Sequence, residues 1–309
     1  MRSLFPSVRC SVLVPASLLL VLSAFTGIAH AQPESAAASP AGSTAVQEPA
    51  DPNPGALSLS GGFDFQSTYM FRGIRQHATG VAAWPWADLG IAAYTGDGGL
   101  KSMGINVGSW NSQHTGDTGI DGPSHKLWYE SDFYVTLGFG FGGGVSLATT
   151  YTAYTSPNNT FSSVKEILVK LSVDDSARLG RGAIRPYVAL ARELDTAPGV
   201  GQADGGAKAG TYLEVGIAPG YTGAKASLAV PVKVGLSLGN YYELAGRDDR
   251  FGFVSVAGLV TVPLGSTTKY GSWNVHGGAE LQRLGGHTAA LNGDHRVRVM
   301  GSIGVGFSY

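Results

Sequence analysis

The chain shows an alternation of apolar and polar residues rather than apolar blocks. In the stretch RVRVMGSIGVGFSY (296–309), every second residue from Val297 to Tyr309 is apolar or glycine, and the residues between are small, polar or cationic. Alternate side chains of a β-strand point to opposite faces, so this stretch is predicted to be a strand with one apolar face.

The same alternation recurs along the chain and predicts twelve strands. Tyr69 and Phe71 fall on the apolar face of the first predicted strand, and Tyr129 and Phe133 fall on that of the fourth. The predicted strands are 57–72, 80–94, 100–111, 126–141, 144–155, 164–173, 183–194, 210–218, 225–238, 251–264, 271–282 and 296–309.

The connections alternate in length as well. Those after the even-numbered strands are mostly tight, and those after the odd-numbered strands are mostly longer and polar. This pattern is typical of an all-β, antiparallel up-and-down barrel of the outer membrane, with short periplasmic turns and longer extracellular loops. The apolar faces would then contact lipid, and the last strand would pair with the first, because an open edge in a membrane leaves backbone groups unpaired.

A soluble, secreted β-sandwich is the alternative fold, since its strands also alternate. Its apolar faces would be buried in a core between two sheets. A sandwich does not need strands of about ten residues whose second faces are consistently polar, which a barrel that crosses a membrane does need. The sequence therefore favours the barrel.

The N-terminal region carries the features of an exported protein. Residues 1–31 combine Arg2 and Arg9 with an apolar core and a small-x-small site before Gln32, which predicts a cleaved signal peptide. Residues 32–55 are rich in Ala, Pro and Ser and predict a disordered leader, so that 56–309 forms the barrel. The single cysteine lies within the signal peptide, and the mature chain is expected to contain no thiol.

The final strand also resembles the C-terminal signal by which barrels are recognised for insertion. Val305, Phe307 and Tyr309 are the apolar residues of that signal. An aromatic ring with a polar tip is favoured at a membrane interface. We therefore expect the barrel assembly machinery, outer-membrane lipids and lipopolysaccharide to be partners of this chain.

Charge and composition narrow the function further. From residue 56 onward the chain holds 19 Lys and Arg against 19 Asp and Glu, because two cationic and three acidic residues precede that point. A nucleic-acid binder needs a basic excess, so this class is not expected. The whole chain contains 46 glycines and no P-loop ending, and no phosphate site is predicted.

Ionisable residues recur on the polar faces of the predicted strands, where they would line the lumen. So many charges are not expected in a dry core. They imply either a lumen that contains water or a dense plug of salt bridges. The candidate lumen-lining residues are Asp64, Arg72, Glu130, Asp132, Glu166, Lys170, Arg185, Glu193, Glu214, Lys233, His276, Glu280, Arg296 and Arg298. Arg72 could pair with an acidic lumen group or with a lipopolysaccharide phosphate.

The width of such a lumen follows from the strand number. Eight strands enclose only side chains and sixteen leave an open channel, so twelve strands lie between these cases. Small inward residues such as Ser58, Ser60 and Gly62 favour a narrow pore. The mixed signs of the lumen charges predict weak ion selectivity.

The histidines give no clear sign of a metal or catalytic site. His77, His114, His125, His287 and His295 fall in predicted outer loops and are expected to be solvated, and His276 is predicted to point inward. A metal site needs several converging ligands, and no cofactor is predicted. A lipid-modifying barrel enzyme would need an outward histidine beside a serine, so no enzymatic activity is expected.

One region resembles a known family. STYMFRGIRQ (67–76) resembles an S-x-Y-x-F-R-G-I-S-Q stretch near the start of the TorF-family porins of Gram-negative bacteria. Similar segments follow at GINVGSWNS (104–112), YESDFYVTLGF (129–139) and YTAYTSPNN (151–159). Beyond Asn159 the resemblance is loose, and Arg75 stands where that family usually has serine. The resemblance implies an outer-membrane barrel of porin type, and it transfers no substrate and no binding residue.

The sequence thus predicts a narrow, weakly selective, porin-like channel for passive diffusion of small polar solutes or ions. Two alternatives stay open: a plugged barrel that acts as a structural or surface-interaction protein, and a lipid-modifying enzyme. The lumen discriminates between the first two. If inward arginine and glutamate side chains meet across the barrel axis, the channel is closed.

Overall fold

The computed structural model describes residues 55–77, 79–116, 127–194, 201–206 and 208–309. The predicted signal peptide (1–31), its cysteine and nearly all of the predicted leader (32–55) lie outside these residues. His125 also lies outside them.

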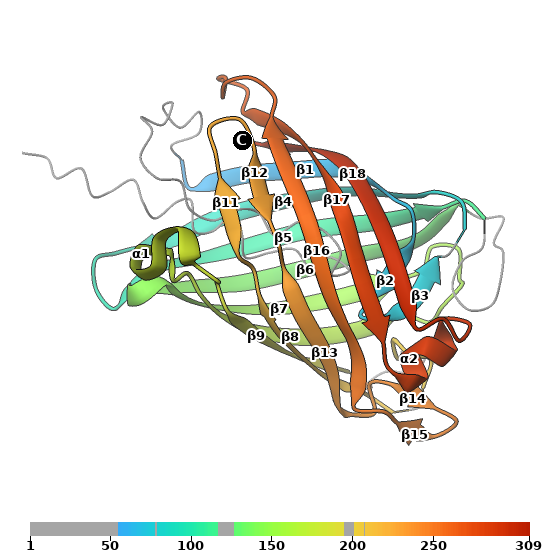
Figure 1. The fold of residues 1–309 in the computed structure, drawn as a ribbon. Coiled ribbons are helices and arrows are strands. Elements are labelled where there is room, and N and C mark those ends of the chain that lie inside the picture. Colours follow the sequence, from blue (N-terminus) through green and yellow to red (C-terminus); the bar gives the residue numbers. More distant parts are fainter. Residues whose placement is uncertain (1–54, 78, 117–126, 195–200, 207) are drawn as a thin grey trace, which may run out of the picture.

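The described residues form one closed β-barrel, whose strands run obliquely round it (Figure 1). Each strand of the wall pairs antiparallel with its neighbours; β18 pairs with β1, and β16 pairs with β17, which closes the cylinder. The wall strands are β1 (Leu57–Gln66), β4 (Ala82–Thr95), β5 (Leu100–His114), β6 (Trp128–Phe141), β7 (Val145–Thr155), β8 (Val164–Val173), β9 (Tyr187–Glu193), β10 (Thr211–Ile217), β13 (Val232–Gly239), β16 (Phe251–Pro263), β17 (Ser272–Leu284) and β18 (Val297–Ser308). The predicted twelve-stranded antiparallel barrel is confirmed.

Two wall strands are interrupted by proline. Pro219 separates β10 from β11 (Gly220–Thr222), and Pro231 separates β12 (Ser227–Ala229) from β13. Proline lacks the N–H that a ladder needs, so the strands break there. The proline carbonyls still accept hydrogen bonds from neighbouring strands: Val230 N–H donates to Pro219 O at 2.8 Å, and Ala257 N–H donates to Pro231 O at 3.0 Å.

The outward face of the wall is apolar and exposed. Phe63 and Phe65 on β1, Phe133 on β6 and Ile303 on β18 all project away from the lumen with a large exposed fraction. A soluble sandwich would bury such side chains, whereas a closed barrel with an apolar outer band satisfies its backbone within the wall and presents hydrocarbon to lipid. The chain is therefore a transmembrane barrel of the outer-membrane type.

The two rims of the barrel differ, as predicted. One rim carries mostly short turns, such as η2 (Gly142–Gly144), and also the longer connection that holds α1 (Ser176–Leu179) and η3 (Gly180–Gly182). The described ends of the chain also meet there, where Leu59 and Tyr309 exchange two backbone hydrogen bonds of 2.7 Å. The other rim carries the long connections, including β14 (Glu243–Leu244), β15 (Arg247–Asp248) and α2 (Gly286–Leu291).

The described part of the chain has little helix. Its α-helices, α1 and α2, have four and six residues. No described helix is long and apolar enough to cross a membrane.

The first predicted strand, 57–72, is wrong beyond Gln66. The chain leaves the wall there and forms a hairpin of β2 (Tyr69–Phe71) and β3 (Ile74–His77), a separate two-stranded sheet in the described part of the chain. We call residues 69–77 the inner hairpin. Its turn residues Arg72 and Gly73 both have positive φ, 48° and 83°, as a two-residue type I′ turn requires.

The inner hairpin folds into the barrel instead of continuing the wall (Figure 1). Tyr69 and Phe71, which were predicted to face lipid, are buried in the lumen. Tyr129 is buried as well, because a register shift in the β5–β6 ladder at Ser112/Gln113 moves it off the outer face.

Candidate functional site in the barrel lumen

The lumen has two unlike halves. In the half that faces the long connections, aromatic side chains fill the space; Tyr69, Trp84, Trp110, Tyr212 and Tyr242 are completely buried. They form two clusters on either side of the inner hairpin. One cluster includes Met70, Ile74, Tyr212, Tyr241, Tyr242, Phe253, Leu284 and Met300, and the other includes Tyr69, Phe71, Trp84, Trp110, Tyr129 and Tyr154.

Arg72, at the tip of the inner hairpin, makes the central polar contact. Its guanidinium donates to both carboxylate oxygens of Glu166 on β8, at 2.5 and 2.8 Å. It also donates to the Tyr241 hydroxyl at 2.8 Å and lies over the Tyr212 ring, 4.3 Å from the ring centroid. Both charged partners are buried, so an inward arginine and glutamate do meet inside the barrel.

Further side chains fix the rest of the hairpin. The Tyr69 hydroxyl donates to Glu130 Oε2 at 2.8 Å, and the Tyr129 hydroxyl donates to Gln76 Oε1 at 2.5 Å. From the outer connection, the Tyr242 hydroxyl donates to the Arg72 carbonyl at 2.9 Å. The described contacts between hairpin and wall are therefore carried by side chains, while β2 and β3 pair only with each other.

The long connections cover the aromatic half of the lumen. Asp204 accepts backbone N–H groups from Gly206 at 2.7 Å and Glu243 at 2.5 Å, which links the segment 201–206 to β14. Burial raises the pKa of the Asp204 carboxyl, and the same two hydrogen bonds oppose that rise. Helix α2 contributes Ala289 and Leu291 to the cluster around Tyr242.

The half that faces the short turns is more open. Inward residues at this level, such as Ser60, Asn106 and Asn274, are only partly buried. Their side chains are small and polar. The lumen thus has a partly exposed polar half near the short turns and a filled aromatic half near the long connections.

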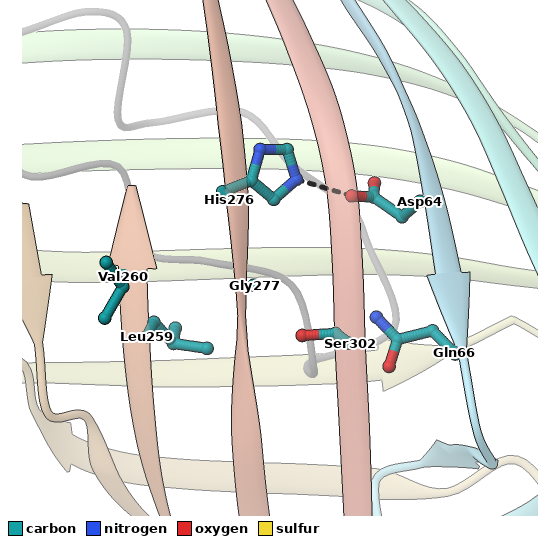
Figure 2. A pocket seen from close by; sticks show the side chains of 7 residues that line it. All are labelled: Asp64, Gln66, Leu259, Val260, His276, Gly277 and Ser302. Carbon is teal, nitrogen blue, oxygen red and sulfur yellow. Dashed lines mark hydrogen bonds and ion pairs between the residues drawn. The ribbon is translucent and has the colours of Figure 1, made fainter. Parts of the chain in front are cut away.

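Between these halves lies a dyad of Asp64 and His276, drawn in Figure 2. Asp64 Oδ1 lies 2.5 Å from His276 Nε2, and His276 Nδ1 lies 2.8 Å from Asn274 Oδ1. The Trp86 indole donates to Asp64 Oδ2 at 3.0 Å. The dyad spans β18, because Gly304 stands between its members and leaves room for their contact.

A small cavity of about 10 Å³ adjoins this dyad and is lined also by Gln66, Leu259 and Ser302. Such a volume holds about one water molecule. In Figure 2, the Gln66 amide points toward β18, and the Ser302 hydroxyl points away from it toward Gly277. The cavity is therefore too small for a solute in this conformation.

Most predicted lumen residues are buried inside the barrel. They are Asp64, Arg72, Glu130, Asp132, Glu166, Glu193, Glu214, Lys233 and Glu280, with Lys170, His276 and Arg298 partly buried. Arg185 and Arg296 differ: both lie outside the wall strands, Arg185 before β9 and Arg296, exposed, before β18. Their predicted strands began too early, so these two arginines lie beyond the strand segments that form the wall. Arg185 instead lies 3.7 Å from Asp174 at the short-turn rim.

The signs of the buried charges are less mixed than predicted. Among the described wall strands, the buried carboxylates are Asp64, Asp88, Glu130, Asp132, Glu166, Glu193, Glu214 and Glu280, whereas Lys233 is the buried cation. Asp88, absent from the predicted set, accepts hydrogen bonds from Asn106 at 2.6 Å and Tyr134 at 3.0 Å. The period-2 pattern of its strand could have indicated it, but alanines on both faces obscured that pattern.

The prediction that the loop histidines are solvated is wrong for two of them. His77 and His114 are buried, with ring centroids 4.6 Å apart. His114 belongs to β5, which runs three residues longer than predicted, and its ring stacks on Tyr129 at 4.4 Å. His287 is partly buried and contacts the Tyr242 carbonyl, and His295 is exposed.

The described residues hold no group of three or more His, Cys, Asp or Glu side chains arranged to bind a metal ion. His276 points into the lumen as predicted and engages Asp64. The side chains that the structure brings together are thus a buried ion pair, a carboxylate–histidine dyad and an aromatic filling.

Comparisons with solved structures find other barrels of low similarity. The chain matches the beta domain of the Bordetella autotransporter BrkA at 13% identity, covering 83% of this chain and 99% of that one, with a TM-score of 0.38. It matches the NanC porin at 12% identity, covering 82% and 99%, with a TM-score of 0.39. It also matches outer membrane phospholipase A from Escherichia coli at 10% identity, covering 80% and 92%, with a TM-score of 0.41.

Sequence comparisons add no family. No family model matches the chain. No curated protein matches it either. The resemblance to the TorF-family porins therefore rests on the short motifs alone.

Proposed function

We propose that the protein is a narrow outer-membrane channel for small polar solutes or ions, closed on its extracellular side by the inner hairpin. The observation that carries the proposal is the Arg72–Glu166 pair, which anchors the hairpin tip inside the barrel. Side-chain contacts hold the hairpin, and its strands β2 and β3 do not pair with a wall strand. The hairpin can therefore leave while the wall stays intact.

The polar lumen supports the channel part of the proposal. The half near the short turns is partly exposed and lined by small polar residues and carboxylates, which suits hydrated solutes. A barrel that served only as a membrane scaffold would be expected to have an apolar interior, since each buried charge costs free energy unless it is paired or hydrated. Membership of the TorF-family porins, suggested by the motif at 67–76, would agree with this reading.

Liposome swelling with solutes of graded size tests the proposal. The intact barrel is compared with a variant that lacks residues 68–79, which joins Ser67 to Gly80. Gln66 already pairs with Ala82 in the β1–β4 ladder, so a tight turn can close the gap. We expect slow swelling with the intact barrel and fast, size-dependent swelling with the variant. Slow swelling with a folded deletion variant would refute the channel.

A plugged barrel with a structural or surface role is the second candidate. The complete burial of Tyr69, Tyr212 and Tyr242 favours it, because such packing is typical of a permanent core. Its signature would be the absence of permeation in both proteins. Neither candidate includes a catalytic step, and His276 is assigned to the lumen dyad.

A further inference from the structure

A second cavity lies at the extracellular mouth, apart from the Asp64–His276 dyad. It measures about 60 Å³ and is bordered by the inner hairpin, β6, β7, β8 and the segment 201–206. Water needs about 10–15 Å³ of such volume, so the cavity has room for about four water molecules or one small organic molecule. The lining residues that matter are Phe71, Gln76, Glu130, Tyr154, Phe161 and Gln202.

The polar atoms of this cavity are mainly hydrogen-bond acceptors. Glu130 is 5% exposed, and its Oε2 atom accepts a hydrogen bond from the Tyr69 hydroxyl. Gln202 is 9% exposed, and its Oε1 atom is buried without a hydrogen-bond partner among the described residues. An unsatisfied buried acceptor costs about 1–3 kcal/mol, so a donor at this position would be favoured.

Among the described residues, no ion pair engages the carboxyl groups at this cavity. Asp132 lies two residues from Glu130 on β6, and both carboxyls are buried. Arg72, the buried arginine of the hairpin, is engaged by both oxygens of Glu166. A buried carboxyl group is stabilised in its charged form when a cation donates to it, so a cationic guest would pair with this site.

The aromatic residues that border the cavity favour an organic ammonium group over other cations. Phe71 and Tyr154 meet edge to face at 5.3 Å, and Phe161 borders the same cavity. Aromatic faces attract ammonium groups and pack against alkyl carbon. A metal ion is a poorer fit, since the described residues hold no three-ligand group of the kind that binds one.

We infer that this mouth cavity is a binding site for the ammonium group of a small primary amine. Its N–H groups would donate to Glu130 and to Gln202 Oε1, and its carbon atoms would pack on the aromatic rings. The inference concerns binding alone, so it can succeed or fail independently of conduction through the barrel.

Calorimetric titration of the refolded barrel with ethylammonium chloride at pH 7 tests the site, with ionic strength held constant by sodium chloride. Saturable binding of one ethylammonium per barrel is expected, with no saturable heat from ethanol, its neutral analogue. Glu130→Gln should weaken binding roughly ten- to a hundredfold, because a charge-assisted hydrogen bond is lost. Asp88→Asn, which removes another buried carboxylate of the wall, is the matched control and should bind as the parent does.

Phe161→Ala provides a second test, because Phe161 lies in a connection and its loss should not prevent folding. Loss of its ring should weaken binding roughly two- to thirtyfold. The inference is overturned if ethylammonium shows no saturable binding, if ethanol binds equally well, or if both substitutions leave the affinity unchanged.

Discussion

At the scale of single residues, Arg72 is the most informative position. It adopts a positive φ of 48°, which is unfavourable for a side chain with a Cβ atom, and Gly73 follows with a φ of 83°. The tight turn aims the guanidinium at Glu166, and the ion pair stabilises a conformation that an arginine rarely adopts. The hypothesis that Arg72 pairs with an acidic lumen group agrees with this geometry.

We predict that Arg72→Ala lowers the free energy of unfolding by about 3–5 kcal/mol, since it leaves the Glu166 carboxylate buried without its partner. Urea unfolding in detergent micelles, followed by tryptophan fluorescence, measures the change. Arg247→Ala is the matched control, because Arg247 is exposed and should change stability by less than about 0.5 kcal/mol. Equal stability of the two variants would contradict the role given to the ion pair.

The contact between Asp64 and His276 depends on the glycine at position 304. A Cβ atom at Gly304 would collide with the Asp64 carboxylate and the His276 ring. We predict that Gly304→Ala costs about 1–3 kcal/mol of stability, the range for overpacking a filled site. Gly301→Ala on the same strand should be neutral, because the nearest atom to its new Cβ is 3.9 Å away. The urea midpoints of unfolding of the two variants measure this difference. A Gly304→Ala barrel as stable as Gly301→Ala would disprove the need for glycine at position 304.

At the scale of elements, the wall strands could be predicted from the sequence and the inner hairpin could not. Each wall strand has one face toward lipid and one toward the lumen, so its residues alternate in character. The hairpin is buried on both faces, and Tyr69 and Phe71 simply continue the alternation of β1 past Gln66. The one local sign was the Arg72-Gly73 pair between apolar residues, which is a weaker turn signal than Asn-Gly.

We predict that the variant without residues 68–79 still folds as a barrel, because the wall ladder is complete without β2 and β3. The circular-dichroism spectrum should be that of a β-protein, and the unheated variant should migrate faster on a denaturing gel than the heated variant. Loss of both properties would show that the hairpin is required for closure of the wall.

At the scale of the whole molecule, the sequence correctly predicted twelve antiparallel strands, because the fold repeats one local pattern. The charges of the lumen depend on which residues the strands actually include. Arg185 and Arg296 fall outside the strands, and Asp88 falls inside, so the lumen is more acidic than a balanced count of charges implied. Arg72 and Glu166 are 94 positions apart in the sequence, so no local sequence pattern predicts their pairing.

We predict that the barrel without residues 68–79 passes cations in preference to anions. The deletion removes Arg72, and the carboxylates of the wall then outnumber its inward lysines. The reversal potential across a potassium chloride gradient measures this preference, and it should shift toward the cation equilibrium potential. The shift should shrink in high salt, where surface charges are screened. A reversal potential on the anion side would contradict the assignment of the lumen charges.

Single-channel conductance in a planar bilayer, recorded for the intact barrel and for the variant without residues 68–79, tests closure by the inner hairpin most directly. For the intact barrel we predict long closed periods with rare or very small current steps, because the hairpin fills the outer half of the lumen. For the deletion variant we predict frequent, discrete steps of reproducible size. If the intact barrel conducts as strongly as the variant, the hairpin does not close it, and if a folded variant never conducts, the barrel is not a channel.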